Sequence, residues 1–181
     1  MARAPAILAA IGLALSLYAL HVEHTQAALE AAKEAASADG SMMAEEFEEY
    51  KSLCDIEALG ASCSATFALP EGRMLSYFGL VAEKSPLDVA NAVLGALYYT
   101  YVMLYSMQIT SSIFPLGLTF FANTMAMASS VFLAYKLLVL KKLCLLCWTT
   151  HVLNFSLIVY YGRKLFGAKG NAASGDKKKS A

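Results

Sequence analysis

Residues 113–140 read IFPLGLTFFANTMAMASSVFLAYKLLVL, an apolar run that carries a single charged side chain, Lys136. Similar apolar runs cover residues 5–22, 87–109 and 143–161. Each run lies near the roughly 20 residues that a helix needs to cross a membrane. The whole chain is 58% hydrophobic, with a mean hydropathy of +0.52, which exceeds what one soluble core requires. The sequence therefore predicts an all-α fold, a four-helix transmembrane bundle.

The 181-residue chain has 14 basic and 14 acidic residues and no formal net charge, which argues against a nucleic-acid partner. The charges are segregated, because nearly all acids lie between Glu23 and Asp88 and six basic residues follow the last apolar run. Lys and Arg are enriched in the cytosolic flanks of spans, so Arg3 and the basic tail place both termini in the cytosol. Three lysines near the opposite face argue against this orientation, but they are fewer than the basic residues that support it; they are Lys136, Lys141 and Lys142.

The first apolar run also fits a secretory signal peptide, since it is short, Ala-rich and preceded by Arg3. Its end carries Tyr18, His21 and Glu23, bulky or polar groups that do not suit a signal peptidase site. We therefore expect a first helix that is retained.

The connections between the runs predict how the bundle is organised. Residues 23–86 form the only long connection and are expected to be a luminal cap loop, helical from His24 to Ser37 and irregular in its Pro- and Gly-containing second half. The short, uncharged segment from Gln108 to Ser112 predicts that the helices on either side are antiparallel neighbours. Residues 1–166 are assigned to one membrane domain and residues 167–181 to a disordered cytosolic tail.

Four cysteines occur in two pairs, Cys54 with Cys63 in the long loop and Cys144 with Cys147 where the fourth run begins. With four spans, both pairs must lie on the same side of the membrane. The orientation given above makes that side the lumen, where disulfides persist.

The Cys144-x-x-Cys147 pair is expected in the first turn of a helix, where unpaired backbone N–H groups and the helix dipole favour the thiolate. Lys141 and Lys142 act in the same direction, so the pair is suited to thiol–disulfide exchange. Other interpretations remain open from the residues alone. Cys54 and Cys63 can form a static disulfide, the C-x-x-C can serve packing, and four cysteines can bind zinc, although the compartment and the spacing disfavour a metal.

At these cysteines the sequence resembles the vitamin K epoxide reductase family, over most of its length. The resembling segments, in chain order, are Leu15 to Val22, Leu53-Cys54-Asp55, Ser62-Cys63-Ser64, Phe78-Gly79-Leu80-Val81, Asn91 with Gly95, Tyr99 and Thr100, and Cys144-Leu145-Leu146-Cys147-Trp148-Thr149-Thr150. The ordered series is specific in a way that a lone C-x-x-C is not.

The resemblance implies a role for each cysteine. Cys147 would meet the quinone or its epoxide, and Cys144 would resolve and re-reduce it. Cys63 would exchange with Cys144, and Cys54 would receive electrons from a luminal thioredoxin-like protein. Two dithiols in relay suit this task, because a quinone dissolved in lipid and a soluble protein donor cannot reach the same sulfur.

Three further residues are candidates for substrate binding. Asn91 is a polar residue within an apolar run, so a ligand carbonyl is one expected partner and an interhelical hydrogen bond is the other. Tyr98 lies seven residues later, on the same helical face. Phe67 resembles a family residue that closes over the ring. As core aromatics, Tyr98 and Phe67 are equally well explained.

His151 departs from the family, which usually has a tyrosine four residues after the second active-site cysteine. The i, i+4 spacing places its ring on the face of Cys147, where it could bind a quinone oxygen and supply a proton. The alternative is a bundle histidine with satisfied hydrogen bonds. The loop departs as well, being longer before Cys54 and one residue wider between Cys54 and Cys63.

The sequence thus predicts a thiol-dependent reductase of vitamin K quinone and its epoxide, with no metal and no tightly bound cofactor. One alternative is a quinone-linked oxidase that generates disulfides in luminal proteins. Another is a claudin-like four-span scaffold with a loop disulfide, which the lack of a loop tryptophan disfavours. The C-terminal Lys178-Lys179-Ser180-Ala181 resembles a dilysine retrieval signal, which predicts a multi-pass protein of the endoplasmic reticulum membrane.

Overall fold

The computed structural model describes residues 3–38, 52, 55, 66, 72–83, 85–109, 114–141 and 143–179, with side chains described as far as Gly167. Every regular element of at least four residues in these ranges is a helix, as predicted. Four helices are long: α1 (Arg3–Ala38), α4 (Asn91–Ser106), α5 (Leu116–Val139) and α6 (Leu145–Lys179). The short α3 (Met74–Tyr77) precedes α4. Cys54, Cys63 and Phe67 lie outside the described residues.

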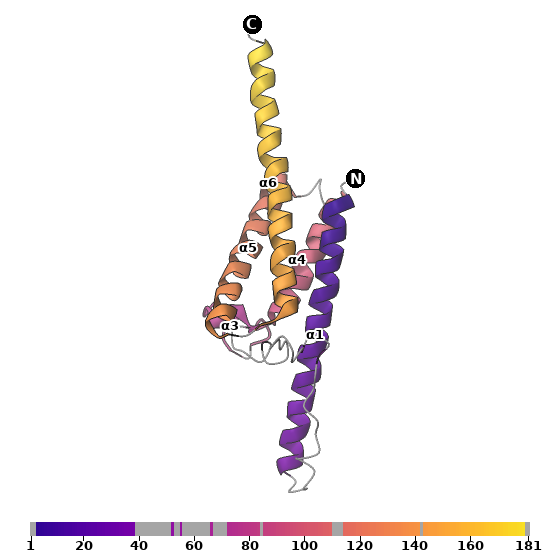
Figure 1. Cartoon of the computed structure of the whole chain (residues 1–181), viewed down its shortest axis with the longest axis vertical. Coiled ribbons are helices and arrows are strands. Elements are labelled where there is room, and N and C mark those ends of the chain that lie inside the picture. Colours follow the sequence, from indigo (N-terminus) through magenta and orange to yellow (C-terminus); the bar gives the residue numbers. More distant parts are fainter. Residues whose placement is uncertain are drawn as a thin grey trace.

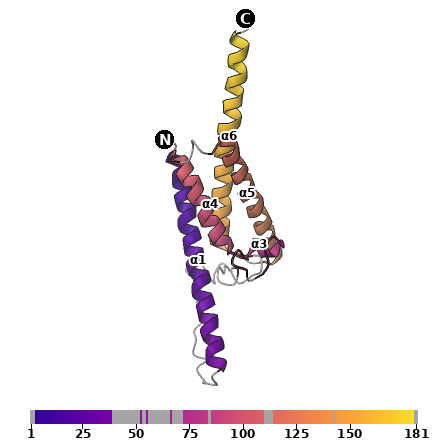
Figure 2. The ribbon, with the colours of Figure 1, turned by 180° about the vertical axis from the view of Figure 1, so that it is seen from behind.

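The four long helices alternate in direction, and α3 lies at the end of the bundle opposite the N-terminus (Figures 1 and 2). The second half of α1 extends past the bundle at the α3 end, and the end of α6 extends past the other (Figure 1). Helix α1 packs along α4, α6 packs along α5, and α1 also contacts α6. The Ala/Glu-rich segment from His24 to Ser37 is helical, as predicted, and continues α1 without a break.

The backbones of α4 and α5 approach each other at only a few positions. They meet at one end, where the Tyr101 hydroxyl hydrogen-bonds Thr119 at 2.8 Å and the rings of Tyr101 and Phe114 pack edge to face. The prediction of adjacent antiparallel helices is therefore confirmed only at this end, because a cavity separates them toward α3.

Small residues bring α1 and α4 close together. A Cβ atom added to Gly12 would overlap the ring of Tyr99, and one added to Gly95 would lie 2.8 Å from the Ser16 hydroxyl. Tyr99 is buried in a core cluster with Val102, Leu157 and other side chains of α1, α4 and α6. Close backbone approach at small residues is typical of helices that associate by packing rather than by hydrophobic burial.

The outer surfaces of the long helices are apolar. Large hydrophobic side chains with 45–65% exposure lie on all four, including Ile7, Ile11, Leu17, Leu97, Leu118, Phe121, Val131, Leu138, Val152 and Phe155. So large an exposed apolar surface marks contact with a membrane or a partner. Within the described residues, the helices covering 3–37 and 116–139 are long and apolar enough to cross a membrane.

The helix in the second apolar run is shorter than the run itself, 87–109. Helix α4 covers Asn91–Ser106, because Ser85 to Leu87 form a turn around Pro86 and because Gln108 adopts a left-handed conformation (φ 65°) after the helix ends. Its 16 residues are about 24 Å long, shorter than a hydrocarbon core of about 30 Å. Helix α6 is longer than the fourth apolar run, because it continues to Lys179. The sequence predicted a disordered tail at residues 167–181.

Candidate functional site

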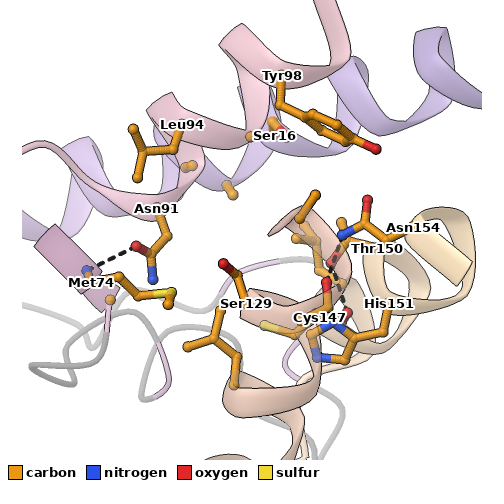
Figure 3. A pocket seen from close by; sticks show the side chains of 18 of the residues that line it. Ser16, Met74, Asn91, Leu94, Tyr98, Ser129, Cys147, Thr150, His151 and Asn154 are labelled. Carbon is orange, nitrogen blue, oxygen red and sulfur yellow. Dashed lines mark hydrogen bonds between the residues drawn. The ribbon is translucent and has the colours of Figure 1, made fainter. Parts of the chain in front are cut away.

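A cavity of about 450 Å³ lies inside the bundle at the α3 end, with walls from α1, α4, α5, α6 and the segment before α4. Figure 3 shows side chains of α4 and α6 facing each other across it. Cys147, Asn91, Tyr98 and His151 all line it. The structure therefore brings together the four described candidates for substrate contact that the sequence predicted.

The C-x-x-C pair lies at the start of α6, as predicted, because α6 begins at Leu145. The Cys144 sulfur accepts a hydrogen bond from the Cys147 backbone N–H at 3.2 Å, and the Trp148 N–H donates to the Cys144 carbonyl. Cys144 thus occupies the N-cap position and satisfies an N–H group that the helix leaves unpaired.

Cys144 and Cys147 form a disulfide, with their Cα atoms 5.3 Å apart. Cys144 has 0% exposure and packs in a core cluster with Ala19, Leu137 and Leu146. Cys147 is partly buried and faces the cavity, whereas Cys144 is not among the lining residues. The two sulfurs are therefore unequal, since only Cys147 can meet a molecule in the cavity.

Asn91 is the first residue of α4 and not a residue inside it. The residue before it, Ala90, has a non-helical backbone (φ −59°, ψ 149°). The Asn91 side-chain oxygen accepts a hydrogen bond from the Met74 backbone N–H at 3.0 Å (Figure 3). Asn91 thereby connects the start of α4 to α3 at the edge of the cavity.

Tyr98 lies on the cavity wall with Asn91, as their spacing of seven residues predicted. Its hydroxyl donates to the Asn123 side-chain oxygen at 2.8 Å, and the Asn123 amide nitrogen donates to the Thr119 carbonyl at 2.7 Å. Asn123 is fully buried. Tyr98 therefore bridges α4 and α5 beside the cavity.

His151 has 9% exposure and packs edge to face on Trp148 with ring centroids 5.7 Å apart. Neither ring nitrogen has a hydrogen-bond partner among the described residues. The alternative of a satisfied bundle histidine finds no support in the described contacts.

A hydrogen-bonded chain across three helices forms another part of the wall. The Tyr99 hydroxyl donates to the Asn154 side-chain oxygen at 2.8 Å, and the Asn154 amide nitrogen donates to the Ser130 hydroxyl at 2.6 Å. Sequence reasoning did not include Asn154 or Ser130 in the site. The spacing of Asn154, three residues after His151 and seven after Cys147, could have identified it, because both spacings place it on one helical face.

Charged groups gather where the cavity meets the segment before α4. Arg73 lies 3.4 Å from the Glu23 carboxylate and 3.8 Å from the Asp88 carboxylate, and it donates a hydrogen bond to the Asp88 carbonyl. Lys136 of α5 donates to the Tyr77 hydroxyl at 2.6 Å. These contacts join α1 to the start of α4, and α5 to α3. No group of three His, Cys, Asp or Glu side chains suited to a metal occurs in the described ranges.

Comparison with known proteins gives a clear result. Residues 4–161 match the model of the vitamin K epoxide reductase family. The chain belongs to the vitamin K epoxide reductase family. Over 159 residues it is 33% identical to vitamin K epoxide reductase complex subunit 1 of Mus musculus and 31% identical to the protein of the same name from Rattus norvegicus. Each alignment covers 85% of this chain and 84% of the relative.

Membership of the vitamin K epoxide reductase family supports an oxidoreductase with redox chemistry of that general type. The match extends from the first turn of α1 to Tyr161 in α6, so it includes α4, α5, nearly all of α1 and the part of α6 that lines the cavity. The cavity with Cys147 on its wall is therefore the candidate active site.

Proposed function

We propose that this protein reduces vitamin K quinone and vitamin K epoxide, with electrons from the Cys144–Cys147 dithiol. The observation that carries the proposal is that Cys147 faces an internal cavity of about 450 Å³ while its disulfide partner Cys144 is buried behind it. A cavity of this size lies within the range of small-molecule sites. The names of the two rodent relatives supply the substrate.

The chemistry balances with the dithiol alone. When the two sulfurs join, they release two electrons, and their thiol groups release two protons. A quinone takes up both electrons and both protons and becomes a hydroquinone. An epoxide breaks its two carbon–oxygen bonds and yields the quinone and one water. The disulfide present in the structure corresponds to the product state of the protein, which must be re-reduced before another turnover.

We propose that Cys63 and Cys54 carry electrons to this disulfide from a luminal thioredoxin-like protein. Cys144 lies in the core, so a folded partner protein cannot attack it directly, whereas a loop of the same chain can. Thr66, three residues after Cys63, lines the cavity, which supports a loop that reaches the site. Each transfer is a thiolate attack that passes through a mixed disulfide.

We propose that all four long helices span the endoplasmic reticulum membrane as one domain of residues 1–166, with both termini in the cytosol. Residues 23–86 would form the luminal cap, and residues 167–181 would be the cytosolic tail. The exposed apolar surface supports burial in lipid. Cys147 and Asn91 both line the cavity, which lies at the α3 end of the bundle. This arrangement supports the parity argument, in which both cysteine pairs lie on the same face of the membrane.

Within the cavity, we assign Asn91, Tyr98 and His151 to the substrate ring. Phe67, which lies outside the described residues, is assigned to the ring from the family resemblance alone. Apolar groups dominate the rest of the lining, for example Leu94, Met125 and Leu133, which suits a ring system with few polar atoms. The quinone is a substrate in this proposal, and no resident cofactor is required.

The test uses the full chain in lipid nanodiscs, with dithiothreitol as the reductant and quinone and epoxide offered separately. The wild-type protein should form hydroquinone and quinone respectively, and Cys147→Ala should reduce turnover to the uncatalysed rate. Cys54→Ala and Cys63→Ala should retain turnover with dithiothreitol and lose it with a thioredoxin-like donor. Retained turnover in Cys147→Ala would contradict the proposal.

The direction of physiological electron flow needs a separate measurement. Mixed disulfides trapped through Cys54 or Cys63 in a Cys144→Ala variant would identify the partner. A dedicated thioredoxin-like protein supports the reductase, and a range of folding client proteins supports the alternative of a quinone-linked oxidase.

A further inference from the structure

We propose that His151 is a catalytic residue that carries a proton from the Cys147 thiol to the substrate oxygen through its two ring nitrogens. This inference rests on the proposed function and deepens it, because it assigns a defined proton-transfer step to a residue that the proposed function places against the substrate ring.

The first observation is that His151 is buried without a described partner. It has 9% exposure, and neither Nδ1 nor Nε2 makes a hydrogen bond within the described part of the chain. A buried polar group without a partner destabilises the folded protein. Such a group inside a cavity points to a ligand that satisfies it.

The second observation is position. His151 follows Cys147 by one helical turn of α6, and both line the same cavity (Figure 3). Side chains at i and i+4 are neighbours on a helix. The edge-to-face contact with Trp148 fixes the ring from the side. A substrate that touches the Cys147 sulfur therefore lies on the same face of α6 as the imidazole.

The third observation is that the neighbouring polar groups are already engaged. The Tyr98 hydroxyl donates to Asn123, and the Tyr99 hydroxyl donates to Asn154. The Thr150 hydroxyl donates to the Cys147 carbonyl at 2.7 Å. Each of these hydroxyls would have to break its present hydrogen bond before it could donate to a substrate. The imidazole nitrogens have no such bond to break among the described residues.

The titratable and charged groups that line the cavity with His151 come from every long helix. Among the described residues they are Glu23 of α1, Tyr98 and Tyr99 of α4, Lys136 of α5 and Cys147 of α6. Glu23 contacts Arg73, and Lys136 donates a hydrogen bond to the Tyr77 hydroxyl. Cys147 is the titratable group on the same helical face as His151, so its thiol is the nearest source of a proton along α6.

The step can be written with all atoms in place. One ring nitrogen of neutral His151 takes the proton from the Cys147 thiol, which leaves the thiolate that reacts with the substrate. The other nitrogen gives its own proton to the oxygen that becomes negative, either the quinone oxygen or the oxygen released when the epoxide opens. The ring is again neutral, in its other tautomer. The second proton comes from the Cys144 thiol when the S–S bond forms.

The experiment follows a single turnover of the reduced full chain in nanodiscs, mixed rapidly with vitamin K quinone between pH 5 and 9. His151→Gln keeps a hydrogen-bond donor but cannot relay a proton. We expect its rate to fall about 100-fold, the lower range for general acid–base catalysis, while quinone affinity changes less than about threefold. The wild-type rate should show a limb at acidic pH that comes from protonation of the imidazole, and this limb should be absent in His151→Gln.

Two controls keep the result interpretable. Ser156→Ala removes a hydroxyl that bonds to the Val152 carbonyl within α6 and does not line the cavity, so it should leave rate and pH profile unchanged. If His151→Gln does not fold, His151→Tyr replaces one ring with another and should move the limb to alkaline pH. Only the limb of the pH profile that differs between the wild-type protein and the variant is assigned to residue 151.

The outcomes separate the two proposals. A wild-type protein that reduces no quinone at any pH contradicts the proposed function. An active wild-type protein whose rate and pH profile are matched by His151→Gln, or by His151→Tyr where that variant is needed, overturns the assignment of His151 alone.

Discussion

The interhelical chain from Tyr99 through Asn154 to Ser130 predicts a measurable loss of stability in Asn154→Leu. Leucine has a similar volume and no polar atoms, so the substitution removes two side-chain hydrogen bonds and leaves the packing volume nearly unchanged. The Tyr99 and Ser130 hydroxyls lose their partner in the middle of the bundle. Tyr99 retains a long contact of 3.5 Å to the Thr150 carbonyl.

The magnitude follows from these contacts. Interhelical hydrogen bonds in membrane proteins contribute about 0.6 kcal/mol on average, and a buried hydroxyl left without a partner costs about 1–3 kcal/mol. Because Tyr99 can fall back on Thr150, we expect a total loss of about 2 kcal/mol. For a chain of this size that corresponds to a decrease in Tm of roughly 4–8 °C.

The assay is thermal unfolding of the full chain in detergent without substrate. Ser156→Ala is the matched control on the same helix, because its hydroxyl bonds to the Val152 carbonyl within α6. A double-mutant cycle with Tyr99→Phe should show positive coupling between Tyr99 and Asn154. A change in Asn154→Leu no larger than in Ser156→Ala, or additive effects of the two substitutions, would refute the reasoning.

Two further substitutions test how α1 is held. Gly12→Leu should lower the Tm, because any Cβ at Gly12 overlaps the Tyr99 ring and overpacking of this kind costs about 1–3 kcal/mol. Gly117→Ala should be tolerated in the same unfolding assay, because the space around Gly117 is open. Equal Tm values for the two variants would contradict this contact. Arg73→Gln should lower the free energy of unfolding by less than about 1 kcal/mol, although Arg73 contacts Glu23. The Arg73 side chain is 49% exposed, and exposed ion pairs contribute little to stability. A loss well above this in unfolding at high salt would show that the Arg73 contacts act as a buried network.

The local part of the site could be predicted from spacing. Four residues separate Cys147 from His151, and seven separate Asn91 from Tyr98, so each pair had to share a helical face. The C-x-x-C at the start of α6 followed from the apolar run that begins beside it. The boundary of α4 could not be predicted in this way, because Pro86 and the left-handed Gln108 shorten the helix while the apolar composition continues on both sides.

By itself, the sequence determined that the chain is helical, that its long helices have apolar outer surfaces and which residues share a face within one helix. Hydropathy and the 3.6-residue period are properties of single segments, so they say nothing about which helix meets which. The pairing of α1 with α4 and of α5 with α6 was decided in the tertiary structure. That pairing leaves α4 and α5 apart, opens the cavity, and buries Cys144 while Cys147 faces the space.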